Sequence, residues 1–289
     1  AVGAYAVGIF TVPVAMRPSV FYATPMNPAI INIYMPLGVA LIFGGLVAAL
    51  IAFVIGTPVL RLRGDYLAIA TLGFSEIIRI VITNASSITN GALGIKNIPP
   101  LNDVRIIFLV TLITFIFITL LINSSYGRAF KAIREDEIAA EAMGINLFFH
   151  KNLAFMISAF FAGIGGGLYG ALLGTVDPKN FLFTLTYNFL LIIVLGGMGS
   201  ITGSMLGSII VTGGLEYLRV FDEPLEIMGV AIPLFRPGFR MVMFSILLMV
   251  CVLFWRKGIM GTEEFTWDKF VYFCRHPLAY FSKKGVQAK

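Results

Sequence analysis

Two side chains of opposite charge, Glu76 and Arg79, stand three residues apart in the run 66–83, which carries no other charge. On a helix this spacing places the carboxylate and the guanidinium on one face, where they can pair. With the hydroxyl groups of Thr71 and Ser75, the pair could offer polar partners to a polar solute. It could instead be a structural pin, that is, an ion pair that holds two helices together, or a group near an external surface. The spacing alone leaves these interpretations open.

A denser set of charges lies in the block 123–151, NSSYGRAFKAIREDEIAAEAMGINLFFHK. Ser124 or Ser125 can cap a helix that begins near Tyr126, and Gly144 is placed to end it, so we predict one amphipathic helix or two short ones. The block is either a solvated loop with pairs such as Lys131 with Glu135, or a docking surface. Its apolar positions are Phe130, Ile133, Ile138 and Met143, and its charged positions are Arg128, Lys131, Arg134, Glu135, Asp136, Glu137 and Glu141.

The sequence carries no pattern typical of catalysis or of ATP binding. No Lys follows a Gly, so the phosphate-binding loop G-x-x-x-x-G-K-[ST] is absent, and any ATP and Mg²⁺ must be bound by other chains. His150 and His276 are too far apart in the sequence to indicate a metal-ligand cluster. We therefore predict a chain that is not an enzyme and that binds no cofactor or metal of its own.

The elements that must position these residues are membrane helices. Of the 289 residues, 58% are hydrophobic and only 12% are charged, whereas soluble proteins carry roughly 25% charged residues. Solid apolar blocks favour helices over a β-barrel. We predict a polytopic, all-α bundle with about eight crossings, near 1–16, 34–55, 66–83, 104–122, 152–174, 182–197, 201–218 and 239–255.

The basic residues orient these crossings. Placing 56–65, 123–151 and 256–289 on one side collects thirteen of the 21 Lys and Arg residues there, so this side is predicted to be cytoplasmic. The net charge of +6 is explained by residues that flank crossings, and nucleic-acid binding is not expected. The chain opens at Ala1 inside an apolar run without a basic flank, and we expect an N-terminal part to be missing.

Small residues recur every four positions in two predicted crossings. They allow helices to approach closely and predict a tight bundle. Gly165, Gly167 and Gly170 also fit the dinucleotide fingerprint G-x-G-x-x-G, but they lie in an uncharged apolar span with no preceding strand, so packing is favoured. The packing residues are predicted to be Gly166, Gly170 and Gly174, and Gly199, Gly203 and Gly207.

The amino-acid sequences of several segments closely resemble those of one family. YGRAFKAIREDEIAAEAMGIN at 126–146, LAFMISAFFAGIGGGLYG at 153–170 and LLIIVLGGMGSITGSMLG at 190–207 are similar to the membrane permease subunits of branched-chain amino acid ABC transporters, M type. RLRGDYLAIATLGFSEIIRIV at 61–81 and GAYAVG at 3–8 fit in the same order. The resemblance covers residues 1–262, a permease domain of type II importer-like fold, and leaves 263–289 as a basic and aromatic cytoplasmic tail.

The resemblance implies an inner-membrane importer subunit. Its partners would be a second, homologous permease, two cytoplasmic ATPases that bind ATP and Mg²⁺, and a periplasmic or lipid-anchored binding protein. The block 123–151, called the coupling block below, would then be the region that fits a cleft on an ATPase. Its apolar positions would anchor the contact, its charges would set the register, and Gly144 would allow the turn away.

The resemblance also bears on Glu76 and Arg79, which with Thr71 and Ser75 would either line the translocation pathway or serve as a structural pin. The solute is expected to be a branched-chain amino acid, with urea or short amides as alternatives within the family. An ion-coupled secondary transporter is the other class of function. It would be expected to show several intramembrane carboxylates, and only Glu76 qualifies.

Overall fold

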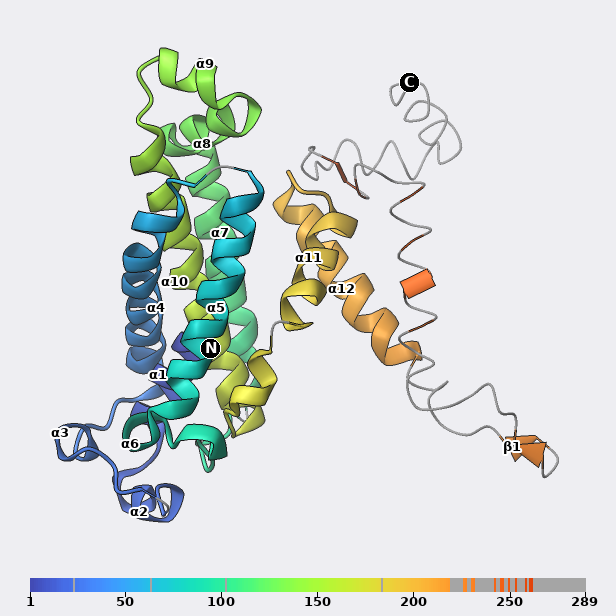
Figure 1. Cartoon of the computed structure of the whole chain (residues 1–289). Coiled ribbons are helices and arrows are strands. Elements are labelled where there is room, and N and C mark those ends of the chain that lie inside the picture. The colour runs from blue at the N-terminus through green and yellow to red at the C-terminus, as the bar shows by residue number, and fades with distance from the viewer. Residues whose placement is uncertain are drawn as a thin grey trace. The chain divides into compact units, whose positions relative to one another are not determined.

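The computed structural model describes residues 1–218 apart from 23, 63, 102 and 183 (Figure 1). Beyond them it describes residues 226–227, 230–231, 242, 245–246, 249, 253, 258 and 260–261. The chain divides into two compact units, Ala1–Leu185 and Thr186–Lys289. The predicted tail 263–289 lies outside the described residues, as does most of the predicted crossing 239–255.

The first unit is built around three helices, α1 (Val2–Thr11), α4 (Leu37–Val59) and α10 (Leu147–Leu173), which pack along one another. α1 is apolar on every side and nearly all of it is buried, as expected of a helix without a polar face. Val7, Leu41 and Leu168 bring the three helices together in one apolar cluster. The core of this unit is therefore the seam between α1, α4 and α10.

Glycines set how closely these helices approach. A Cβ atom on Gly163 of α10 would lie 2.7 Å from the Cβ of Ala48 and 3.0 Å from the carbonyl oxygen of Gly44, both on α4. A Cβ atom on Gly167, one turn later, would lie 2.6 Å from a methyl group of Val7 on α1. Because no side chain fits at such distances, these two glycines permit the backbone contact.

The predicted packing glycines of α10 occupy three different settings. Gly170 is buried, and a Cβ atom there would lie 2.6 Å from a methyl group of Val176. Gly166 faces Ala4 at ordinary contact distance. Gly174 follows the last residue of α10 with φ +67°, a left-handed conformation that favours glycine, so it ends the helix and does not lie on its face.

Four described helices are long and apolar enough to cross a membrane: α4, α5 (Asp65–Asn84), α7 (Val104–Asn123) and α10. Their 20 to 27 residues correspond to about 30–40 Å of helix, against about 30 Å of hydrocarbon. They match the predicted crossings at 34–55, 66–83, 104–122 and 152–174. α10 starts at Leu147 rather than 152 because Asn146 caps it, accepting the Phe149 N–H at 3.0 Å.

The prediction of eight crossings is met only in part. α1 covers 10 residues of the predicted crossing at 1–16, about 15 Å, and ends at Thr11 rather than at residue 16. It ends at Thr11 because Pro13 cannot donate a helical hydrogen bond and favours an extended conformation at Val12, whose ψ is 125°. The expected N-terminal part before Ala1 stays a prediction.

Short elements close the two ends of the first unit (Figure 1). At one end, the segment that follows α5 joins the C-terminal end of α10, where the N–H of Ile95 donates to the carbonyl of Val176 at 2.9 Å. At the other end lie the turn between α4 and α5, α8 (Ser125–Glu135) and α9 (Glu137–Ala142). Two of the three segments predicted to be cytoplasmic, 56–65 and 123–151, thus share one end. The elements of the opposite end are η1 (Val14–Met16), α2 (Arg17–Val20), α3 (Pro28–Ile31), α6 (Ser86–Thr89), η2 (Gly91–Leu93) and η3 (Pro178–Phe181).

The second unit contains most of α11 (Thr184–Gly196) and all of α12 (Ile201–Tyr217), at the places of the predicted crossings 182–197 and 201–218. They pack through Leu195 and Val211. A Cβ atom on Gly207 would lie 2.5 Å from the carbonyl oxygen of Ile192, and Gly203 approaches Gly196 as closely. Gly199 lies in the turn between the helices rather than on a helix face. Beyond them, β1 (Glu226–Ile227) and β2 (Val230–Ala231) form an antiparallel pair.

Candidate functional site

The coupling block folds as two short helices, α8 and α9, one of the two outcomes predicted. The Ser124 hydroxyl caps α8 by accepting the Gly127 N–H at 3.3 Å. Asp136 has an extended backbone, φ −154° and ψ 115°, and its carboxylate caps α9 by accepting the N–H groups of Ile138 at 2.8 Å and Ala139 at 3.0 Å. Asp136 therefore divides the block, and Gly144, with φ +82°, follows its end.

The four predicted anchors do not share one face. Ile138 and Met143 are 81% and 83% exposed. Ile133 is buried within this chain, and Phe130 is half-buried with its ring 6.1 Å from that of His150, centre to centre. Ile138 and Met143 are therefore free to meet another protein, whereas Ile133 and Phe130 are covered within this chain, Phe130 beside His150 of α10.

The charges of the block form local pairs. Glu135 pairs with Arg134 at 2.6 Å rather than with Lys131, the pair that the spacing suggested. Glu137 of α9 accepts from Lys151 of α10 at 2.7 Å. Arg128 donates to the Ser125 hydroxyl at 3.0 Å. Lys131, Asp136 and Glu141 are exposed, so most of the charge of the block faces solvent.

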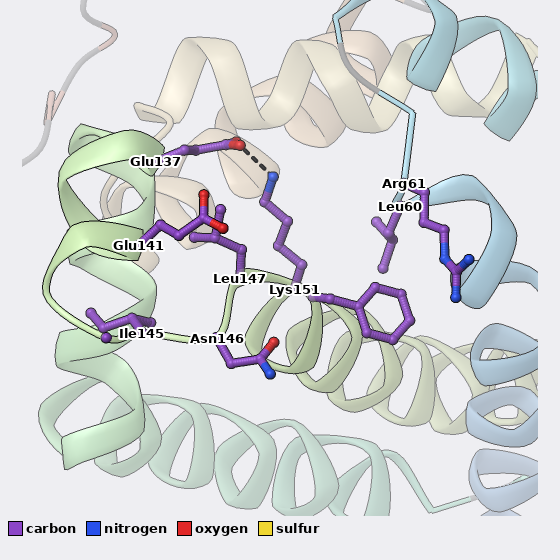
Figure 2. A pocket seen from close by; sticks show the side chains of 10 residues that line it. Leu60, Arg61, Glu137, Glu141, Ile145, Asn146, Leu147 and Lys151 are labelled. Carbon is purple, nitrogen blue, oxygen red and sulfur yellow. Dashed lines mark ion pairs between the residues drawn. The ribbon is translucent and has the colours of Figure 1, made fainter.

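An open pocket of about 510 Å³ lies where the block meets the end of α4 (Figure 2). Figure 2 shows Glu137 and Glu141 on one side, Arg61 on the other, and Lys151 reaching toward Glu137. The Arg61 guanidinium lies 5.5 Å from the centre of the Phe148 ring, within reach of a cation–π contact. The two predicted cytoplasmic segments therefore touch each other directly. No spacing rule linked Arg61 to Phe148, because 87 residues separate them in the sequence.

Glu76 and Arg79 do pair, as their spacing on α5 predicts. Arg79 Nε donates to Glu76 Oε1 at 2.9 Å, and Nη2 of the same guanidinium contacts the same oxygen. The Thr71 and Ser75 hydroxyls each donate to a carbonyl of α5 itself, at 2.8 and 2.7 Å. α5 contributes only Ile82 to the buried core, and the charged side chains remain 29–44% exposed. Among the described residues, the hydrogen bonds of this pair stay within α5.

Arg17 is a buried cation that the sequence did not single out. Its side chain is fully buried and donates to the carbonyls of Val12 at 3.1 Å, Ile30 at 2.8 Å, Ile31 at 2.6 Å and Ile33 at 2.6 Å. Burial lowers the pKa of this guanidinium. The residue ties α3 and the residues directly after it to the end of α1. The one available sequence signal was its position directly after an apolar run.

The four long apolar helices and the charged block at one end define a multi-pass membrane protein that presents a polar surface beside the bilayer. The model of the family "Branched-chain amino acid transport system / permease component" matches residues 1–251. The chain therefore belongs to the branched-chain amino acid ABC permeases, and its relatives place it with the M type. The relatives are transport permeases rather than enzymes, and the apolar helices of this chain fit a multi-pass protein of the inner membrane.

Several curated relatives are similar to this chain. The LivM permease of the high-affinity branched-chain amino acid transport system from Escherichia coli (strain K12) is 39% identical over 68% of this chain and 54% of its own length. A probable LivM permease from Methanocaldococcus jannaschii is 27% identical over 78% of this chain and 69% of its own length. The LivH permease of Escherichia coli (strain K12) is 36% identical over 55% of this chain and 47% of its own length.

The chain spans about half the length of the first of these relatives. No solved structure gives a significant match.

Proposed function

We propose that this chain is the M-type permease subunit of an ATP-driven importer with a type II importer fold. It forms the translocation pathway with a second, homologous permease. Two cytoplasmic ATPases bind ATP and Mg²⁺ and hydrolyse the ATP, and an extracytoplasmic binding protein delivers the solute. The proposed solute is a branched-chain or related hydrophobic amino acid, because the relatives of both the M and H types are named for that transport.

The observation that carries the proposal is the exposure of Ile138 on α9 and of Met143 directly after that helix. Both belong to the block that the family resemblance assigns to ATPase contact, and both lie at the end where basic residues predict the cytoplasm. Burying an apolar side chain of this size in an interface stabilises the complex by about 1.5–3 kcal/mol. The surrounding charges, among them Arg134, Glu135 and Glu141, would then select the partner and fix its register.

The first test replaces both exposed anchors in the complete complex, purified with the ATPases and the second permease. Ile138→Asp with Met143→Asp is expected to abolish co-purification of the ATPases, because two carboxylates would be buried without partners. Val104→Asp is the matched control, since Val104 is 68% exposed at the opposite end of the first unit. The control is expected to retain the ATPases, and both proteins should insert into the membrane.

Uptake into proteoliposomes tests the energy source. Accumulation of a branched-chain amino acid is expected only with internal ATP and the binding protein. Uptake that persists without ATP and follows an ion gradient would overturn the importer assignment in favour of a secondary transporter. Competition by urea or short amides, with none by leucine, would instead correct the solute and keep the importer.

A further inference from the structure

α9 is the least anchored element of the coupling block. It has six residues, and Ala140 is the one buried among them. It is joined to α10 through Gly144, whose backbone is left-handed and which no neighbouring atom crowds. A backbone hydrogen bond from Ile145 to Ala140, 3.1 Å long, closes the turn. Such a junction gives α9 freedom to pivot about Gly144 unless side chains restrain it.

One ion pair spans this junction. Glu137 begins α9 and Lys151 lies in the second turn of α10, so their 2.7 Å contact crosses Gly144 and joins the two helices (Figure 2). The side chains are 47% and 28% exposed, which gives the pair partial protection from solvent. Its effect is geometric: it fixes the direction of α9, and with it that of Ile138 and Met143.

A second contact continues the connection into the bundle. Phe148, in the first turn of α10, lies under the guanidinium of Arg61 from the turn after α4. α10 in turn packs along α4 and α1 over much of its length. Through α10, the Glu137–Lys151 ion pair and the Arg61–Phe148 contact therefore connect the exposed helix α9 to the end of α4.

We infer that Lys151 is a positioning residue for coupling: it makes α9 move as one body with α10, so that displacement of α9 by an ATPase is transmitted to the membrane helices. Without this ion pair, α9 would remain docked and would pivot about Gly144, and ATP hydrolysis would drive less transport. The inference rests on the proposed function, because it requires an ATPase bound at Ile138 and Met143.

The test is the number of solute molecules transported per ATP hydrolysed by the complete complex in proteoliposomes. Lys151→Met is expected to lower this ratio about fivefold while the ATPases still co-purify and the unfolding temperature falls by no more than about 2–4 °C. This factor corresponds to about 1 kcal/mol, the upper part of the range for a partly exposed ion pair. Lys96→Met, on the segment at the opposite end of the unit, is the control and is expected to keep the wild-type ratio.

A charge exchange separates coupling from simple loss of a lysine. Lys151→Glu alone is expected to lower the ratio further than Lys151→Met, because two carboxylates then face each other. Adding Glu137→Lys is expected to restore most of it. The inference would be overturned if Lys151→Met kept the wild-type number of solute molecules per ATP. It would also be overturned if the exchanged variant assembled with the ATPases but did not recover this number. If the wild-type chain itself recruits no ATPase, the proposed function fails instead.

Discussion

At the scale of single residues, Arg17 shows how backbone carbonyls can stabilise a buried charge that pairs with no carboxylate among the described residues. Its guanidinium is satisfied by four carbonyl groups at 2.6 to 3.1 Å, which spreads the charge over backbone dipoles. Replacing it by Met leaves those carbonyls without their donors in a buried site, at a cost of about 1–3 kcal/mol for each that finds no other partner. Arg17→Met is therefore expected to lower the thermal unfolding temperature of the detergent-solubilised protein clearly.

Two further variants sharpen this prediction. Arg105 has an exposed side chain, so Arg105→Met removes the same charge without uncovering a carbonyl and is expected to change little. Arg17→Lys keeps the charge but presents fewer donors in a different geometry, so an intermediate loss is expected. Equal unfolding temperatures for Arg17→Met and Arg105→Met would show that the buried hydrogen bonds contribute nothing.

At the scale of elements, the packing of α10 on α4 depends on Gly163 and not on the glycines of the predicted four-residue repeat. Gly163→Ala places a methyl group 2.7 Å from Ala48 and 3.0 Å from a backbone carbonyl, so the two helices must separate. We expect a destabilisation of about 1–3 kcal/mol, measured by thermal unfolding in detergent. Gly165→Ala is the matched control, two residues away on α10 with open space around it, and is expected to be neutral or slightly stabilising.

The two glycines also show how far sequence could predict the elements. Hydropathy located α4, α5, α7 and α10, because long apolar runs leave few alternatives to a membrane helix. It could not tell which face of α10 meets a neighbour, since an all-apolar helix has no polar side to mark the direction. In the coupling block, the apolar spacing treated Ile133 and Ile138 alike, but Asp136 interrupts the helix between them and turns one inward and the other outward.

At the scale of the whole molecule, the Glu76–Arg79 pair indicates what α5 faces. An ionised group at the centre of a bilayer costs about 2.5–3.5 kcal/mol on insertion scales, so a face that carries two is not turned to lipid. Within the described residues, Glu76 and Arg79 form hydrogen bonds with each other and with no other helix. We propose that this face of α5, with Thr71 and Ser75, lines the translocation pathway beside the second permease.

The pathway role predicts a defect in transport without a defect in assembly. Glu76→Gln keeps the size of the side chain and removes its charge, leaving Arg79 unpaired where a zwitterionic solute must pass, so we expect uptake to fall about tenfold in the assembled complex. Val81→Ala is the control, because Val81 is 59% exposed and projects from a different side of α5.

If Glu76→Gln left both the uptake rate and the preference among amino acids unchanged, the pair would be excluded from the pathway. If instead it prevented co-purification of the second permease, the pair would belong to the contact between the two permeases, because an unpaired guanidinium would then be buried in that interface.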